Sequence, residues 1–174
     1  MKIKYILLFT AIFLLFFACK NASEEKHLFI LSGQSNMALL DPKESFIPYV
    51  EKTFGEEKII LVKQAWGAKP IMRWYKKWEL GGFTSPTGAD LYDSLINKID
   101  LAIYNEKLAS VSFFWMQGER DARLSYSSIY EESLMGLHHQ LKEKFGREDI
   151  NMVIGRLNDF GFGKEDRYPE WQLV

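Results

Sequence analysis

Four short apolar runs, each followed by a polar or glycine-containing segment, constrain the fold of this chain more than any other feature. Each run has the length of a buried strand rather than that of a buried helix. The predicted strands are His27–Leu31, Lys58–Lys63, Val111–Met116 and Met152–Leu157.

The segments between these runs predict two long helices and two loops. Apolar residues recur at helical spacing in Leu91–Tyr104 and again in Tyr126–Phe145. Asp41–Phe54 contains two prolines and no clean period, so it predicts mainly loop with about one helical turn. Gly67–Pro86 predicts a long loop that carries a short helix around Ile71–Trp78.

Strands that alternate with helices imply a parallel sheet with helices packed on it, the α/β class. Functional sites of such sheets lie at the carboxyl ends of the strands. This rule predicts a site made from four segments, which are Ser32–Met37, Gln64–Pro70, Gln117–Asp121 and Asn158–Gly163.

Composition excludes several classes of function. The formal net charge of −1 argues against a strongly basic nucleic-acid binder. A single cysteine permits neither an intrachain disulfide nor a cysteine-rich metal site. The adjacent His138 and His139 point about 100° apart on a helix and do not form a metal pair. We expect no metal, no organic cofactor and no nucleic-acid partner.

The first residues predict export rather than fold. Two lysines precede the apolar run Tyr5–Ala18, which is shorter than the roughly 20 residues of a membrane span. Phe16–Cys19 resembles the lipobox of a bacterial lipoprotein signal, which implies a lipidated Cys19 anchored to the cell envelope. Residues 1–18 would then be the signal peptide and residues 19–26 a tether. An ordinary signal peptide or an uncleaved anchor is the alternative.

The first predicted strand ends in a possible nucleophile motif. In Gly33–Met37 a serine, Ser35, directly follows a strand and a glycine, which exposes its hydroxyl on a tight turn. Met37 replaces the second glycine of the usual nucleophile elbow, and a serine that only caps a helix is the alternative. After the other strands, Gly67 offers an unhindered backbone amide and Gln117 offers a side-chain amide.

These segments together resemble one group of enzymes. Gly33–Met37, Trp66–Trp74 and Trp115–Ala122 are similar to motifs of the sialate O-acetylesterase-like group of the SGNH hydrolases, which includes carbohydrate acetylesterases. The resemblance runs from about Leu28 to the end of the chain. It implies a flavodoxin-like three-layer α/β/α fold and an esterase domain over residues 27–174.

The resemblance also implies roles for individual residues. Ser35 is the expected nucleophile, and the Ser35 amide, the Gly67 amide and the Gln117 side chain are the expected oxyanion donors. Ester hydrolysis builds negative charge on the carbonyl oxygen, and preorganised donors stabilise that charge. Supporting or substrate-contacting roles are expected for Gln34, Asn36, Glu119 and Asp121.

Some side chains keep two interpretations. Glu119 is expected to hold loops by accepting hydrogen bonds, with direct substrate contact as the alternative. Four tryptophans are candidates for stacking on a sugar ring, and at least one is expected in the core. They are Trp66, Trp74, Trp78 and Trp115.

A general base is the missing part of this motif set. The resembling enzymes take it from an Asp-x-x-His segment after their last strand, and the sequence to Val174 contains none. His27 opens the first strand, and His138 and His139 lie within a helix, so none is expected at the site. We therefore expect a chain that lacks its last strand and this segment, with Tyr168–Val174 as the start of a helix.

The sequence thus predicts a serine esterase that removes acetyl groups from carbohydrate, either sialic acid or an acetylated glycan such as xylan. Without the histidine, the sequence as given is expected to be inactive or nearly so. The alternative is an envelope lipoprotein that binds carbohydrate in the same pocket without turnover. A purely structural envelope protein would leave the three motifs unexplained.

Overall fold

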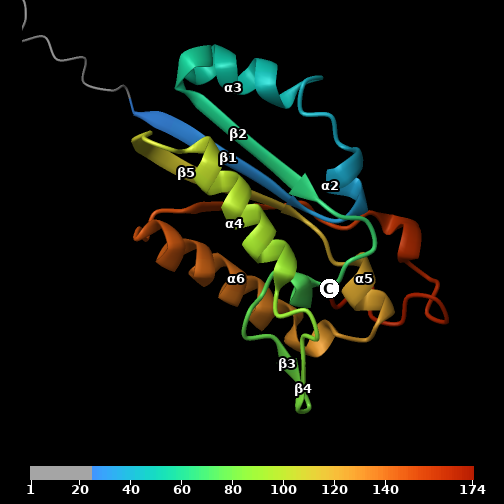
Figure 1. The fold of residues 1–174 in the computed structure, drawn as a ribbon. Helices are drawn as coiled ribbons and strands as arrows, with labels where there is room; N and C mark the ends of the chain where they lie inside the picture. The colour runs from blue at the N-terminus through green and yellow to red at the C-terminus, as the bar shows by residue number, and fades with distance from the viewer. Residues whose placement is uncertain (1–24) are drawn as a thin grey trace, which may run out of the picture.

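The structure, a computed structural model, describes residues 25–174, so the predicted signal segment and Cys19 lie outside the described residues. Its centre is a parallel sheet in the order β2-β1-β5-β6 (Figure 1). The strands are β1 (Lys26–Gly33), β2 (Ile59–Ala65), β5 (Leu108–Met116) and β6 (Asn151–Ile154). The four predicted strands are confirmed, and the order is that of a flavodoxin-like sheet.

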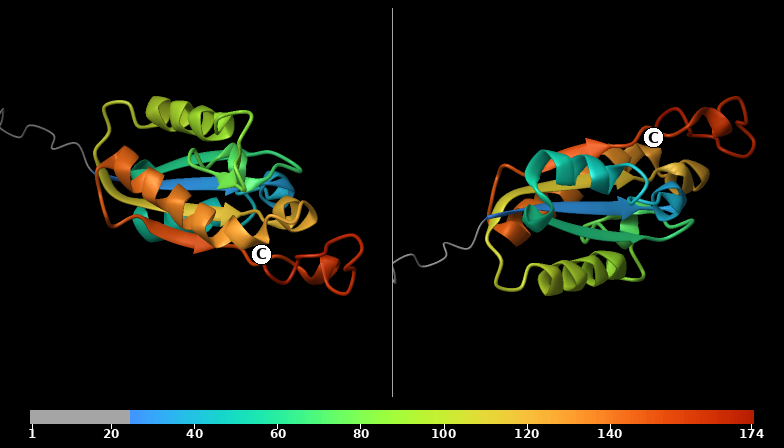
Figure 2. Two further views of the ribbon diagram at one scale, coloured as in Figure 1. Left: turned by 90° about the horizontal axis from the view of Figure 1, so that it is seen from below. Right: turned by 90° about the horizontal axis from the view of Figure 1, so that it is seen from above.

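Helices cover both faces of the sheet, which gives the molecule three layers (Figure 2). Successive side chains of a strand point to opposite faces, so β1 sends Leu28 into one core cluster and Phe29 into the other. One face packs against α4 (Asp90–Ala102) and α6 (Tyr130–Phe145), and the other packs against α2 (Ser35–Leu39) and α3 (Phe46–Phe54). The predicted fold class is therefore confirmed.

The core under α4 and α6 takes up most of the tryptophans. Trp74, Trp78 and Trp115 are buried there, and the rings of Trp74 and Trp115 meet edge to face at 5.2 Å. Trp66 is 49% exposed. The expectation that at least one tryptophan belongs to the core is confirmed, and only Trp66 keeps an accessible ring.

Segment 41–54 contains the nine-residue helix α3, so the prediction of mainly loop was wrong. Pro48 is the third residue of the helix, where the backbone N–H would have no intrahelical acceptor, so proline removes no hydrogen bond there. Phe46 and Val50 lie one helical turn apart and pack against the same face of the sheet. In the sequence, the two prolines outweigh this apolar pair and therefore predict mainly loop.

The two long predicted helices are confirmed as α4 and α6. A short 3-10 turn, η3 (Ser127–Ile129), precedes α6, which ends at Gly146 in the left-handed conformation with φ 61°. No helix of the described part of the chain is long and apolar enough to cross a membrane.

The predicted long loop between β2 and α4 is confirmed in outline. It contains the 3-10 turn η2 (Ile71–Arg73), shorter than the predicted helix, and an unpredicted hairpin, β3 (Glu79–Leu80) and β4 (Phe83–Thr84). The remaining short elements are η1 (Glu56–Lys58), α5 (Glu119–Arg123) and η4 (Asp159–Gly161).

The last residues form turns, so the prediction of a helix from Tyr168 was wrong. Trp171 packs against Gly161, where a Cβ atom would overlap its ring. The Trp171 Nε1 donates a hydrogen bond to the Asn158 carbonyl at 2.9 Å. These contacts close the segment after β6 into a loop. A single helical turn remains at its end, where the Val174 amide donates to the Glu170 carbonyl at 3.2 Å, and no regular helix is formed.

Candidate active site

A pocket of about 420 Å³ lies at the carboxyl ends of the parallel strands, where the topology rule predicts the site. All four predicted segments contribute to it. Its lining includes Gln34, Ser35, Asn36, Gly67, Ala68, Glu119, Arg120, Arg123, Asn158, Phe160, Tyr168 and Trp171.

Gly33 sets the position of the serine. It adopts φ 142°, and a Cβ atom there would overlap the carbonyl oxygen of Met116 at the end of β5. Glycine alone allows this approach. The backbone N–H of Gln34 then donates to the Met116 carbonyl at 2.9 Å. Ser35 is the first residue of α2 and is partly buried in the pocket.

The two residues whose backbone amides are expected to bind an oxyanion line the same pocket. Neither Ser35 N nor Gly67 N donates a hydrogen bond to any other residue of the described range. A Cβ atom at Gly67 would meet no atom within 4 Å, so this amide is sterically accessible. The structure thus brings Ser35 and Gly67 together as predicted.

Gln117 lies behind the pocket wall and lines a neighbouring cavity of about 580 Å³. It is 2% exposed. Its Nε2 donates to the Asp121 carboxylate, to the Lys69 carbonyl at 3.1 Å and to Gln34 Oε1 at 3.3 Å. Its Oε1 accepts from the Tyr130 hydroxyl at 3.0 Å. Its role as an oxyanion donor remains a prediction, and it requires that one of these acceptors be released.

Asp121 is fully buried and connects two of the site segments. Its carboxylate accepts from Gln117 and from the backbone amide of Ile71, at 3.0 and 3.2 Å to the two oxygens. Burial raises its pKa to about 7. Asp121 therefore fixes the loop of Gly67 to α5 and does not line the serine pocket itself.

Glu119 and Asn36 link α5 to α2 across the pocket. Asn36 Nδ2 donates to Glu119 Oε1 at 2.6 Å. The second oxygen, Oε2, is buried without a hydrogen-bond partner, and burial raises the pKa of this carboxyl. This geometry agrees with the loop-holding role expected for Glu119.

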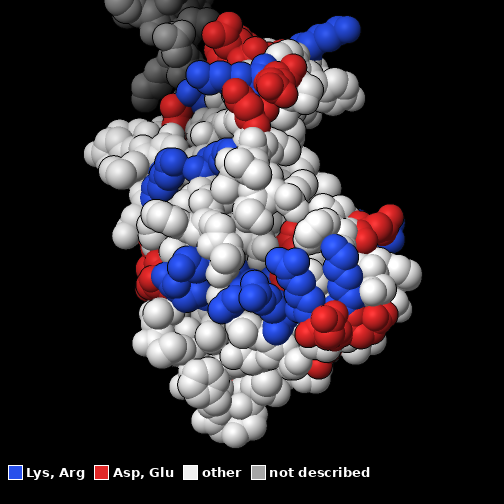
Figure 3. Space-filling model, turned by 90° about the vertical axis from the view of Figure 1, so that its right-hand side faces the viewer, with Lys and Arg blue, Asp and Glu red and all other residues white. Residues whose placement is uncertain are grey.

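Basic side chains are numerous at the pocket end of the molecule (Figure 3). Figure 3 views this end of the molecule and shows a band of lysine and arginine side chains across it. Arg120 and Arg123 line the pocket together with one acidic residue, Glu119. Neither arginine forms a salt bridge with a described residue.

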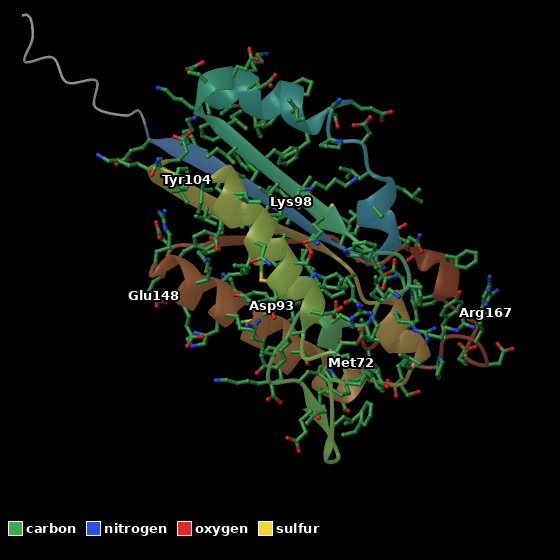
Figure 4. The ribbon with its side chains drawn as sticks, in the orientation of Figure 1. Met72, Asp93, Lys98, Tyr104, Glu148 and Arg167 are labelled. Carbon is green, nitrogen blue, oxygen red and sulfur yellow. The ribbon has the colours of Figure 1, made fainter. Side chains whose placement is uncertain are left out.

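The aromatic part of the pocket comes from Phe160, which lies in the predicted segment Asn158–Gly163, and from two residues beyond it, Tyr168 and Trp171. The centroid of the Tyr168 ring lies 6.2 Å from that of Phe160 and 4.8 Å from that of Trp171. Arg167, labelled in Figure 4, lies over Tyr168 at 5.3 Å on the same projecting segment. The sequence could have indicated these residues only by their place after the fourth strand, because that strand ends at the pocket.

The histidines lie away from the pocket, as predicted. His27 Nδ1 contacts the Ser110 hydroxyl at 2.8 Å near the amino end of β1. His138 Nε2 contacts the Ile150 carbonyl at 3.0 Å, and His139 pairs with a glutamate on the surface of α6. Within residues 25–174 no group of three or more metal-ligating side chains forms a cluster.

The fold and the pocket together define a class, a flavodoxin-like α/β domain of the SGNH hydrolase type. Within it, the chain belongs to the family described as "Carbohydrate esterase, sialic acid-specific acetylesterase", whose model matches residues 39–173. The matched region begins after Ser35, so the assignment of the serine depends on the geometry above.

Among solved structures, a protein of Arabidopsis thaliana matches the fold with a TM-score of 0.63 and 18% sequence identity. The match covers 86% of this chain and 81% of the Arabidopsis chain. At this identity the likeness shows the fold alone. No curated protein matches the sequence.

Proposed function

We propose that this protein is a serine O-acetylesterase that acts on acetylated carbohydrate through Ser35. One observation carries the proposal: Ser35 and Gly67 line one pocket, and the backbone amides of both are free of partners among the described residues. Family membership supports esterase activity on carbohydrate in general. The specific acetylated sugar is open between sialic acid and a neutral glycan.

The proposed reaction has two halves. The Ser35 oxygen attacks the acetyl carbonyl carbon, and its proton passes to solvent water, because no histidine of residues 25–174 lines the pocket. The two amides hold the negative charge on the carbonyl oxygen. The sugar oxygen leaves with a proton, and an acetyl-serine remains. Water then attacks this ester, which releases acetate and restores the Ser35 hydroxyl.

Carbohydrate binding without turnover is the second candidate function. It is favoured by the observation that no histidine of residues 25–174 lines the pocket. Phe160, which is 56% exposed, offers an apolar face to a sugar ring in either case, and Tyr168 and the buried Trp171 support this wall of the pocket.

A paired assay separates the two functions. Acetate release is measured from an acetylated neutral oligosaccharide, from an O-acetylated sialic acid and from 4-nitrophenyl acetate. For an esterase, Ser35→Ala lowers acetate release, because the nucleophile is lost. No histidine of residues 25–174 lines the pocket, so the wild-type rate is itself expected to be low, and the decrease is smaller than in an enzyme with a complete triad. Equal rates in both proteins overturn the esterase. Saturable sugar binding that survives Ser35→Ala, with no acetate released by either protein, identifies the binding function.

We also propose that the protein is exported and anchored to a bacterial cell envelope through lipid on Cys19. The sequence of residues 16–19 supports this. Mass spectrometry of the mature protein is the test. An N-terminal peptide that begins at Cys19 with a diacylglycerol mass is expected, and an unmodified chain with another N-terminus overturns the proposal.

A further inference from the structure

The side-chain amides of Gln34 and Gln117 face each other beneath the pocket. Gln117 Nε2 donates to Gln34 Oε1 at 3.3 Å. Each amide group has two N–H donors. Their hydrogen bonds therefore determine which of the two can donate to a substrate.

The donors of Gln117 are already used. Nε2 has three acceptors: the Asp121 carboxylate, the Lys69 carbonyl and Gln34 Oε1. A backbone carbonyl can only accept, so the end of the Gln117 amide that faces Lys69 must be the nitrogen. The orientation of this amide is thus fixed, and its two N–H groups point into the protein.

The donors of Gln34 are free. Gln34 Oε1 also accepts from the backbone amide of Arg120 at 3.2 Å. A backbone N–H can only donate, so the end of the Gln34 amide that faces Arg120 must be the oxygen, which leaves Nε2 at the other end. Gln34 is 3% exposed and lines the pocket beside Ser35. Nε2 has no partner among the described residues, yet it is not among the nitrogens sealed from water.

We propose that Gln34 is a catalytic residue whose Nε2 donates to the oxyanion formed when Ser35 attacks an acetyl ester. Gln117 is then a positioning residue, which holds Gln34 by donating to its Oε1. The inference depends on the proposed esterase function. It adds a third oxyanion donor to the backbone amides of Ser35 and Gly67. The sequence predicts instead that the Gln117 side chain is this third donor.

Two substitutions of Gln34 remove the donor in different ways. Gln34→Glu keeps an oxygen for the Arg120 amide and for Gln117 but has no N–H. Gln34→Met has a similar length, carries no charge and has no N–H. We expect both to lower kcat about 100-fold, with KM changed less than about threefold, because the oxyanion exists only in the transition state.

The outcomes distinguish this inference from the proposed function. If Ser35→Ala abolishes turnover while both Gln34 variants stay within about threefold of the wild-type kcat, the role of Gln34 is overturned and the esterase stands. If Ser35→Ala retains full activity, the esterase itself fails. Thermal unfolding of each variant checks that a lost kcat does not reflect a lost fold.

A measurement on the protein without turnover tests the geometry directly. Side-chain amide signals in ¹H–¹⁵N NMR spectra are assigned from their loss in Gln34→Glu and Gln117→Met, and acetate is titrated as a mimic of the oxyanion. The Gln34 signals should shift saturably, while the Gln117 signals stay fixed and exchange slowly with solvent. Shifts of Gln117 alone, or of neither residue, overturn the proposal.

Discussion

The two walls of the serine pocket are built in different ways. The inner wall comes from the strand ends (residues 33–36, 67–71 and 117–121) and is held by buried polar side chains. The outer wall comes from residues 158–171, where Phe160 is 56% exposed. Under the proposed esterase function, the inner wall would fix the reacting groups and the outer wall would contact the sugar.

The hydrogen bonds of the two walls differ in range. Asp121 and Gln117 join segments about 50 residues apart in sequence. The outer wall is closed mainly by local bonds, from the Phe160 amide to Asn158 and from Trp171 to Asn158. Among the described residues, one hydrogen bond joins it to a segment distant in sequence, from the Ser127 amide to the Glu170 carboxylate at 2.8 Å. Substitutions should therefore affect stability mainly in the inner wall.

The largest effect is expected for Gly33→Ala in the inner wall. The methyl group would overlap the Met116 carbonyl, and φ 142° disfavours any side chain. We expect the free energy of unfolding to fall by more than about 4 kcal/mol, as measured by urea denaturation.

Gly163→Ala in the outer wall is the matched control. Gly163 also has a positive φ, 70°, but a Cβ atom there would meet no neighbour within 4 Å. The cost should be about 1–2 kcal/mol, that of the backbone conformation alone. Equal costs at the two glycines would contradict the proposed contrast between the walls.

Asp121 should make stability depend on pH. Its pKa is about 7 in the folded protein and 3.8 in the unfolded reference, so between these values the folded state binds more protons. The free energy of unfolding should then fall as pH rises from about 4 to 7, by up to about 4 kcal/mol. Asp121→Asn should flatten most of this slope in denaturant titrations at each pH.

A smaller slope should remain in Asp121→Asn, because burial also raises the pKa of Glu119. Asp93→Asn is the control, since Asp93 lies on the exposed side of α4 (Figure 4). A wild-type protein whose stability is constant over this window would contradict the raised pKa of Asp121.

Phe160→Ala should change substrate binding with little change in stability. Loss of one stacking face should raise KM for an acetylated oligosaccharide about five- to tenfold, or roughly 1 kcal/mol. Hydrolysis of ethyl acetate, which has no sugar ring, should be unchanged. Phe162→Ala is the control, because Phe162 is similarly exposed but lines the neighbouring cavity. An equal increase in KM in both variants would contradict a contact between Phe160 and the sugar.

Arg123→Ala should have the smallest effect. Arg123 is exposed at the pocket rim and has no salt bridge among the described residues, so stability should change by less than about 0.5 kcal/mol. KM for a neutral acetylated sugar should stay within about twofold. A larger KM increase for an O-acetylated sialic acid, reduced by added salt, would show that Arg123 recognises a carboxylate.

The inner wall was largely predictable from the sequence, and the reason is topological. Parallel strands bring their carboxyl ends to one edge, so apolar runs alone located Ser35, Gly67 and Gln117 at the same end of the sheet. What the sequence could not resolve was the direction of each amide. The donors of Gln34 and Gln117 differ through partners such as Arg120 N and the Lys69 carbonyl, which only the three-dimensional structure places.

The outer wall and α3 were not predictable for other reasons. In residues 158–171 the conformation depends on contacts such as Trp171 on Gly161, which have no periodic signature. In α3 the prolines suggested a break, although Pro48 lies in the first turn, where it is tolerated. Local patterns identify regular elements, but not loops whose geometry depends on a partner.

The common direction of the four strands has a practical consequence for handling the protein. β1 starts at Lys26 on the edge opposite the pocket, and its eight residues span about 26 Å. Immobilisation through the N-terminus on a biosensor surface would therefore leave the pocket facing the solution. The Val174 side chain, in contrast, lies 2.6 Å from the position that a Cβ on Gly118 would take, and it lines the neighbouring cavity at the pocket end of the sheet.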